Sequence, residues 1–145
     1  GTLFRQTQFA EFEMQTNALV ENGESLNAEI LNSLYLEINK KYYGDDMISD
    51  EEISYEWARI PHFYYNFYVY QYATSFSAAV TIAHEILEKG EPVVKRYKEF
   101  LSGGCSMKPV DLLKQVGIDL ESPEPIQTAL DVMGTVIKEL EEIID

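Results

Sequence analysis

The sequence predicts an all-α fold in which six or seven helices pack into one compact unit, residues 1–145. Apolar residues recur at steps of three and four along most of the chain, and the periodic stretches end at glycine or proline. No stretch alternates apolar and β-branched residues with polar ones between hairpin turns. Apolar residues make up 46% of the composition, which is enough for a substantial core.

Two helices are expected at the start of the chain. The first covers the apolar positions between residues 3 and 20 and stops at Gly23, because glycine readily adopts the left-handed backbone that follows a helix. Ser25 is the expected N-cap of the second helix, since its hydroxyl can accept a hydrogen bond from a free backbone N–H. Gly44 is the expected end of that helix.

The middle of the chain predicts a short helix and then a long one. Ser49 and Glu52 have the spacing of a capping box, which predicts a short helix in "MISDEEISYEW". Proline is favoured in the first turn of a helix, so one long helix is expected from Pro61 to about Lys89. Gly90 ends it.

Three further helices complete the prediction. "EPVVKRYKEFLS" is ended by the glycines at 103 and 104, and "KPVDLLKQVG" is ended by Gly117. The last helix follows Ser122, its expected cap. Its apolar stripe consists of Val132, Val136, Ile137, Leu140 and Ile144.

The charge balance excludes one class of partner and disfavours another. With 11 Lys and Arg against 25 Asp and Glu, the net charge is -14, which is unsuited to nucleic acid or an anionic membrane surface. No apolar run reaches the roughly 18 residues of a membrane span. The single cysteine, Cys105, allows no internal disulfide and fits a reducing compartment.

The segment "RIPHFYYNFYVYQYATSFSAA", residues 59–79, holds the candidate functional residues. Five tyrosines follow His62 within ten residues, and every buried phenol needs a hydrogen-bond partner. At about 100° per residue, a helix would carry one group of these side chains on one side. That group is His62, Tyr65, Tyr68 and Tyr72.

Two interpretations of this segment stay open on the residues alone. Imidazole and phenol groups facing a cleft could donate hydrogen bonds to an oxygen that develops negative charge. Alternatively, the segment is an aromatic core helix whose hydroxyls bind backbone or water.

Two other candidates favour a structural interpretation. "HEILE", residues 84–88, resembles the zinc-binding HExxH pattern, but Glu88 replaces the second histidine and no third ligand is evident. An exposed His84 that pairs with Glu88 one helical turn away is the simpler expectation. Cys105 lies in the loop-like "SGGCSMKP" without a histidine nearby in sequence, so it lacks the base that a nucleophilic thiol needs.

Four segments together resemble the C-terminal part of oligoendopeptidase F, in the thimet-oligopeptidase-like zinc metallopeptidases. They are "TLFRQTQFAEFE", "KKYYGDD", "WARIPHFYYNFYVYQYATSFSAA" and "SPEPIQTAL". The resemblance implies a helical fold around a deep channel, zinc-dependent cleavage of oligopeptides and a cytoplasmic location. In that family zinc is held by an HExxH motif and a downstream glutamate, which lie upstream of the matching segments. The chain is therefore expected to bind no metal itself, to be inactive alone, and to have the HExxH-bearing part of the same protein as its partner.

The resemblance also implies a role for the aromatic segment. In these peptidases a histidine and one or more tyrosines from this region bind the substrate carbonyl and stabilise the tetrahedral oxyanion. His62 matches the family histidine. Tyr65, Tyr68 and Tyr72 are chosen with it because they share its expected helical side, although an ungapped alignment with the thimet branch places Phe67 and Thr74 at the tyrosine positions.

Other classes of function remain open at this stage. The chain could be a free-standing helical module that binds peptides or a partner helix without catalysis, or a purely structural remnant. In the peptidase interpretation, the aromatic side around Phe63, Phe67 and Tyr70 and the apolar stripe Leu3–Phe12 would be partly uncovered in the isolated chain, and self-association is expected.

Overall fold

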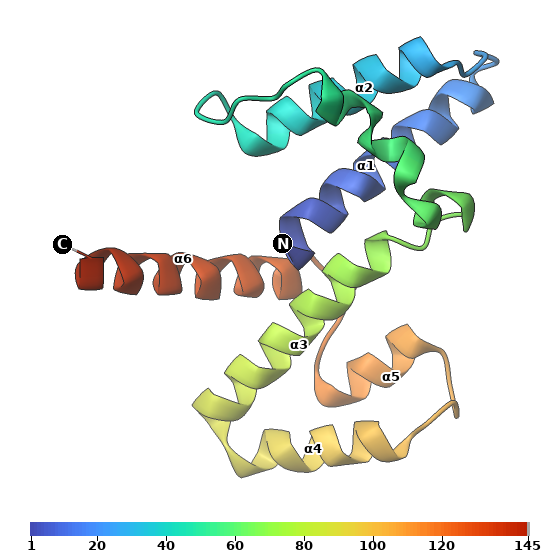
Figure 1. Ribbon diagram of the computed structural model, residues 1–145. Coiled ribbons are helices and arrows are strands. Elements are labelled where there is room, and N and C mark those ends of the chain that lie inside the picture. The colour runs from blue at the N-terminus through green and yellow to red at the C-terminus, as the bar shows by residue number, and fades with distance from the viewer. Residues whose placement is uncertain (145) are drawn as a thin grey trace. The chain divides into compact units, whose positions relative to one another are not determined.

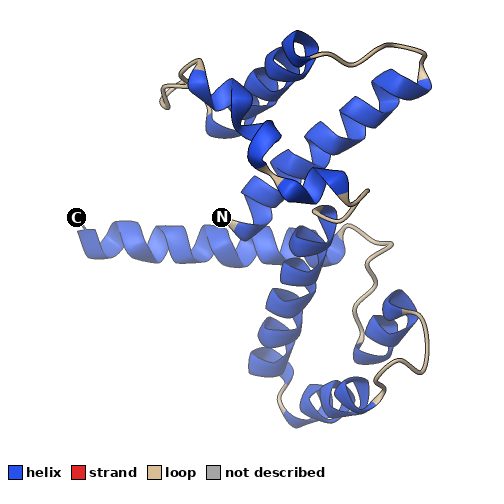
Figure 2. Ribbon diagram, turned by 45° about the vertical axis from the view of Figure 1, so that its right-hand side comes forward, coloured by secondary structure: helices blue, strands red, loops and turns tan. Residues whose placement is uncertain are grey.

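The computed structural model describes residues 1–144 and confirms the all-α prediction. Every regular element in that range is a helix (Figure 2). By its contacts the chain divides into two compact units, Gly1–Ala73 and the residues from Thr74 onward, where the sequence predicts one. None of the helices in the described range is long and apolar enough to cross a bilayer.

The first unit is built from α-helices and 3-10 helices (Figure 1). They are α1 (Thr2–Glu21), α2 (Ala28–Tyr43), the 3-10 helices η1 (Glu52–Arg59) and η2 (Pro61–Tyr64), and the first turn of α3 (Tyr70–Lys89). The α2 helix packs against both α1 and η1. The predicted stops of α1 and α2 are confirmed, since Gly23 and Gly44 both have positive φ, at 86° and 72°.

Aromatic rings fill the core of this unit. Its buried members are Phe9, Phe12, Tyr35, Ile38, Ile60 and Val69. The expected exposure of the stripe Leu3–Phe12 is therefore wrong for Phe9 and Phe12, because both rings pack inside this core. The Phe12 ring stands edge-on to Tyr35 at 5.2 Å and tilted against Phe63 at 5.2 Å. Burying one such ring stabilises the fold by about 1.5–3 kcal/mol. The core therefore ties α1, α2 and the chain on both sides of η2 into one body.

The N-cap of α2 is Asn27, and the prediction of Ser25 was wrong. The Asn27 side-chain oxygen accepts a hydrogen bond from the Ile30 N–H at 2.9 Å. Asn27 has the extended backbone that an N-cap requires, and the helix starts one residue later. Both residue types make good caps, so the sequence alone could not choose between them.

We expect Asn27→Ala to lower the free energy of unfolding by about 1 kcal/mol, because one N–H of the first turn loses its partner. The matched control is Ser25→Ala, which removes an exposed hydroxyl outside the helix and should leave stability unchanged. Denaturant unfolding of both variants measures the difference. Equal losses for the two would contradict the assignment of the cap.

The expected capping box before η1 is also wrong. The element is a 3-10 helix that begins at Glu52, and the Asp50 carboxylate accepts the hydrogen bond from the Ile53 N–H. The Ser49 hydroxyl instead accepts a hydrogen bond from the Asn39 side chain on α2. Ser49 therefore links the loop to α2 rather than capping the next helix.

The long helix expected from Pro61 to Lys89 is broken. It consists of η2, a turn at residues 65–69, and α3. Asn66 and Phe67 in the turn have positive φ values of 41° and 54°, which an α-helix cannot contain. On an unbroken helix Phe63 and Val69 would point about 120° apart. The break lets Val69 join, and Phe63 contact, the same core.

The second unit contains the remainder of α3 and three further helices. These are α4 (Glu91–Ser102), α5 (Pro109–Val116) and α6 (Glu124–Ile144). The predicted extents of α4 and α5 are confirmed, and α6 begins two residues before the stretch predicted for it, whose last residue, Asp145, lies outside the described residues. Gly117 ends α5 in the left-handed conformation, with φ at 101°. Ser122 accepts a hydrogen bond from the Glu124 N–H, as predicted. The core of the unit is formed by Ala78, Ile82, Val116 and Ile118.

Candidate functional site

The turn between η2 and α3 gathers the predicted site residues into one cluster. His62 lies on η2, Tyr65 and Tyr68 lie in the turn, and Tyr72 lies in the first turn of α3. The Tyr68 ring stacks on His62 with centroids 5.6 Å apart and planes 20° apart. We call these four residues the imidazole–phenol cluster.

The other rings of the imidazole–phenol cluster meet edge to face. Tyr65 and Tyr72 stand edge-on to His62 at 6.2 Å and 6.0 Å, and Tyr72 stands edge-on to Tyr68 at 5.5 Å. The Tyr72 hydroxyl lies 3.4 Å from His62 Nε2. The side chains that the sequence grouped together are thus close in space, although the helix on which that grouping was based does not exist.

The Tyr72 hydroxyl keeps its proton at neutral pH. The hydrogen bond with Tyr68 raises the pKa of the Tyr72 hydroxyl above its ordinary value of 10.0, and burial adds to the effect. A phenol with a raised pKa keeps its proton throughout the physiological range. Tyr72 therefore remains a neutral phenol at physiological pH.

The cluster faces solvent in this chain. The exposed fractions of Tyr65 and Tyr68 are 64% and 41%, while His62 and Tyr72 are half-buried. The neighbouring rings of Tyr64, Phe67 and Tyr70 are exposed as well. Large exposed aromatic groups are typical of a surface that a ligand or a partner covers.

The remaining sequence candidates are placed differently. His84 is exposed on α3, and its neighbour Glu85 forms an ion pair with Lys89 at 2.5 Å. No three His, Cys, Asp or Glu side chains within residues 1–144 are close enough to hold a metal ion together. The residues present therefore do not fit a zinc site. Cys105 is an exposed free thiol in the connection between α4 and α5.

Two buried glutamates near the cluster were not singled out from the sequence. Glu13 on α1 is 5% exposed and accepts a hydrogen bond from the Phe67 N–H at 2.7 Å. Glu56 on η1 accepts hydrogen bonds from Tyr35 at 2.6 Å and from Arg5. Glu13 follows Phe9 by four positions and so lies on the apolar face of its helix, a signal that could have identified it.

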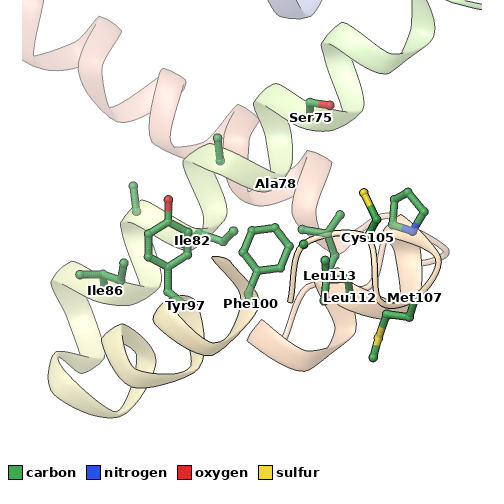
Figure 3. A pocket seen from close by; sticks show the side chains of 14 residues that line it. Ser75, Ala78, Ile82, Ile86, Tyr97, Phe100, Cys105, Met107, Leu112 and Leu113 are labelled. Atoms are coloured by element: carbon green, nitrogen blue, oxygen red, sulfur yellow. The ribbon is translucent and has the colours of Figure 1, made fainter. Parts of the chain in front are cut away.

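An apolar groove of about 770 Å³ lies within the second unit (Figure 3). Ile82 on α3, Tyr97 and Phe100 on α4, and Leu113 on α5 point into it, and Cys105 lies at one end. The lining is largely hydrocarbon. The groove offers a surface for packing, whereas the imidazole–phenol cluster offers groups for acid–base or hydrogen-bond chemistry.

The known proteins that this chain resembles are peptidases. The chain belongs to peptidase family M3, whose family model matches residues 1–132. It is 51% identical over 144 residues to oligopeptidase PepF of Bacillus subtilis, and this alignment covers 99% of the chain and 22% of PepF. It is 45% identical over 145 residues to the plasmid-encoded oligoendopeptidase F of Lactococcus lactis, and this alignment covers 100% of the chain and 24% of the relative.

A solved structure shares the fold. The crystal structure of oligoendopeptidase F from Enterococcus faecium superposes with a TM-score of 0.96 at 45% identity. The match covers 100% of this chain and 28% of the other. The resemblance inferred from the sequence segments is confirmed, and the chain spans about a quarter of the length of the relatives that it matches.

Proposed function

We propose that this chain supplies the substrate-facing donor wall of an oligopeptidase cleft. The observation that carries the proposal is the exposed imidazole–phenol cluster, in a chain whose relatives are oligoendopeptidases. Peptide hydrolysis passes through a tetrahedral intermediate whose oxygen carries negative charge. His62, Tyr65, Tyr68 and Tyr72 would bind the scissile carbonyl and stabilise that oxygen.

The arrangement suits this role because it is fixed before substrate arrives. The His62 and Tyr68 rings are already stacked, and the Tyr72 hydroxyl is already next to the imidazole. Preorganised donors stabilise developing charge without the cost of reorienting solvent. A flexible group of phenols would lose conformational entropy when it is ordered around the substrate, and this cost would offset much of the stabilisation.

The metal of the complete protein would be held outside this chain. We propose zinc, which supplies Lewis acidity to peptide hydrolysis when bound. A cytoplasmic location of the complete protein stays a proposal as well, supported by the single cysteine.

We expect the isolated chain to hold no stoichiometric zinc and to hydrolyse no oligopeptide, because a catalytic zinc needs three protein ligands. Metal analysis of the dialysed chain and an assay with a quenched peptide measure this. One tightly bound zinc per chain, or hydrolysis that a chelator abolishes, would contradict the proposal.

The HExxH-bearing part of the same protein is the proposed partner, and self-association is the expected substitute when that part is missing. The last turns of α6 expose Val136, Leu140 and Ile143, and the turn exposes Phe67. Such apolar surface favours association. Sedimentation at tens of micromolar, a rough scale for weak association, should show species larger than a monomer, and a clean monomer would count against this expectation.

The proposed function is tested by the binding of a transition-state analogue. In the complete, metal-loaded protein, His62→Ala should weaken the binding of a phosphinic peptide by about 100-fold, because that group mimics the tetrahedral oxyanion. Binding of the corresponding product peptide should change little. Equal weakening for both ligands would indicate a general binding surface, which is what the alternative of a non-catalytic module predicts.

A further inference from the structure

We propose that Glu13 is the positioning residue that holds the imidazole–phenol cluster in its working geometry. The inference rests on the proposed function for its kinetic consequence, but the positioning itself can be measured separately. Glu13 lies on α1, 54 positions before Phe67, the residue that it binds.

The contact of Glu13 with the turn is short and enclosed. Its Oε1 accepts the hydrogen bond from the Phe67 N–H at 2.7 Å, and the residue is 5% exposed. A carboxylate that accepts from a backbone N–H forms a charge-assisted hydrogen bond, which is stronger than a neutral one. Little water competes for an enclosed acceptor, so the bond is stronger than it would be at the surface.

The turn needs such an anchor because its backbone is strained. Asn66 and Phe67 follow each other with φ values of 41° and 54°. Asparagine tolerates this region, but a residue with the bulk of phenylalanine rarely adopts it. Strained backbone of this kind persists only where the surroundings hold it. Glu13 binds the N–H of the more strained of the two residues.

The conformation of the turn decides where the rings of the cluster lie. His62 precedes the turn, and Tyr68 follows Phe67 directly. Val69, which is 1% exposed, anchors the far end of the turn in the core, and Phe63 anchors the near end. Between those two anchors, the hydrogen bond from the Phe67 N–H to Glu13 fixes the backbone conformation of the turn, and this conformation stacks Tyr68 on His62.

A purely structural role does not require a carboxylate at this position. Burying an anion costs desolvation free energy, and an apolar side chain on the same face of α1 would avoid that cost. What the carboxylate adds is an acceptor aimed at one backbone N–H. Its effect is therefore local to the turn, and through the turn it reaches the cluster.

The test compares four variants of the complete, metal-loaded protein. Glu13→Ala and Glu13→Met both remove the acceptor, and Glu13→Met fills the space and so protects the fold. We expect both to lower kcat by about 10- to 100-fold with little change in KM, because small misplacements of catalytic groups can cost that much. Glu13→Gln keeps an oxygen acceptor and should restore most of the activity.

The matched control is Glu11→Ala. Glu11 lies on the same helix, and its carboxylate accepts hydrogen bonds from Lys41 and Tyr42 on α2. This variant should keep kcat close to wild type. If Glu13→Met keeps a normal kcat, or if Glu11→Ala lowers kcat as much, Glu13 is only a structural residue and the inference is wrong.

A spectroscopic measurement separates this inference from the proposed function. The NMR signals of the His62 ring, assigned by their loss in His62→Ala, carry the ring-current shift of the stacked Tyr68. They should move in Glu13→Met and stay in place in Glu11→Ala. If they move while His62→Ala itself keeps normal turnover, the proposed function fails and the positioning role stands. Unmoved signals in Glu13→Met would overturn the positioning role.

Discussion

Replacing His62 by alanine in the complete, metal-loaded protein is expected to lower kcat by roughly 100- to 1000-fold while KM stays within a few-fold of wild type. A donor to the oxyanion acts mainly in the transition state, so its loss appears in turnover rather than in substrate binding. Tyr72→Phe should follow the same pattern, because its hydroxyl is next to His62 Nε2 and keeps its proton at neutral pH. Steady-state kinetics on a quenched oligopeptide measure both changes.

The remaining phenols and one control complete this experiment. Tyr65→Phe and Tyr68→Phe show which hydroxyls act with the imidazole. Tyr55→Phe is the matched control, since Tyr55 is also exposed but its hydroxyl binds Glu51, away from the cluster. A purely structural phenol would instead cost about 1 kcal/mol of stability with normal kinetics. If every variant within the cluster keeps turnover within a few-fold of wild type, the site assignment is wrong.

Replacing Glu56 by alanine is expected to lower the free energy of unfolding by about 3 kcal/mol, because it leaves buried polar partners unpaired. The Glu56 side chain is 7% exposed and receives hydrogen bonds from Tyr35, Arg5 and Arg59. These bonds join α1, α2 and η1 around the aromatic core. Glu11→Ala is the control, because its ion pair with the exposed Lys41 should contribute only about 1 kcal/mol or less. Thermal unfolding of both variants gives the comparison, and similar losses would contradict the expectation.

Because of Glu56, the free energy of unfolding is also expected to depend on pH. Burial raises the pKa of Glu56, but the hydrogen bonds from Tyr35 and Arg5 outweigh that effect and hold the pKa below its ordinary value of 4.5. The stabilisation is therefore complete above about pH 4.5 and is lost as the pH falls through the lower pKa of the folded state. Glu56→Gln should be less stable at pH 7 and should lose less further stability on acidification. Unfolding curves at several pH values check the sign.

The helices and their ends follow largely from local sequence. Glycines at 23, 44 and 117 end helices where predicted, because a residue with positive φ is favoured there and local sequence shows it. The N-cap of α2 was misplaced because Ser25 and Asn27 offer the same chemistry, and only the path of the chain decides which one meets a free N–H. Local rules also predict that Ser49 caps η1, but its hydroxyl accepts a hydrogen bond from Asn39 on α2 instead.

In the imidazole–phenol cluster, too, local sequence and tertiary contacts determine different features. The sequence alone determined which chemical groups are available, an imidazole followed by phenols, and grouped the four residues that lie together in the structure, His62, Tyr65, Tyr68 and Tyr72. It did not determine how they meet. Helical periodicity placed them along one side of a continuous helix, whereas the structure folds them around a strained turn.

Only the tertiary structure could decide that turn. The positive φ values of Asn66 and Phe67 are unfavourable for the isolated segment, so propensities based on neighbouring residues would not predict them. They are stabilised by the burial of Val69 in a core built from α1 and α2, and by the Glu13 carboxylate, 54 positions away in sequence. Local sequence indicates where helices begin and end, because capping groups and backbone hydrogen bonds join residues only a few positions apart. The geometry of the cluster depends on contacts that exist only after distant segments have packed together.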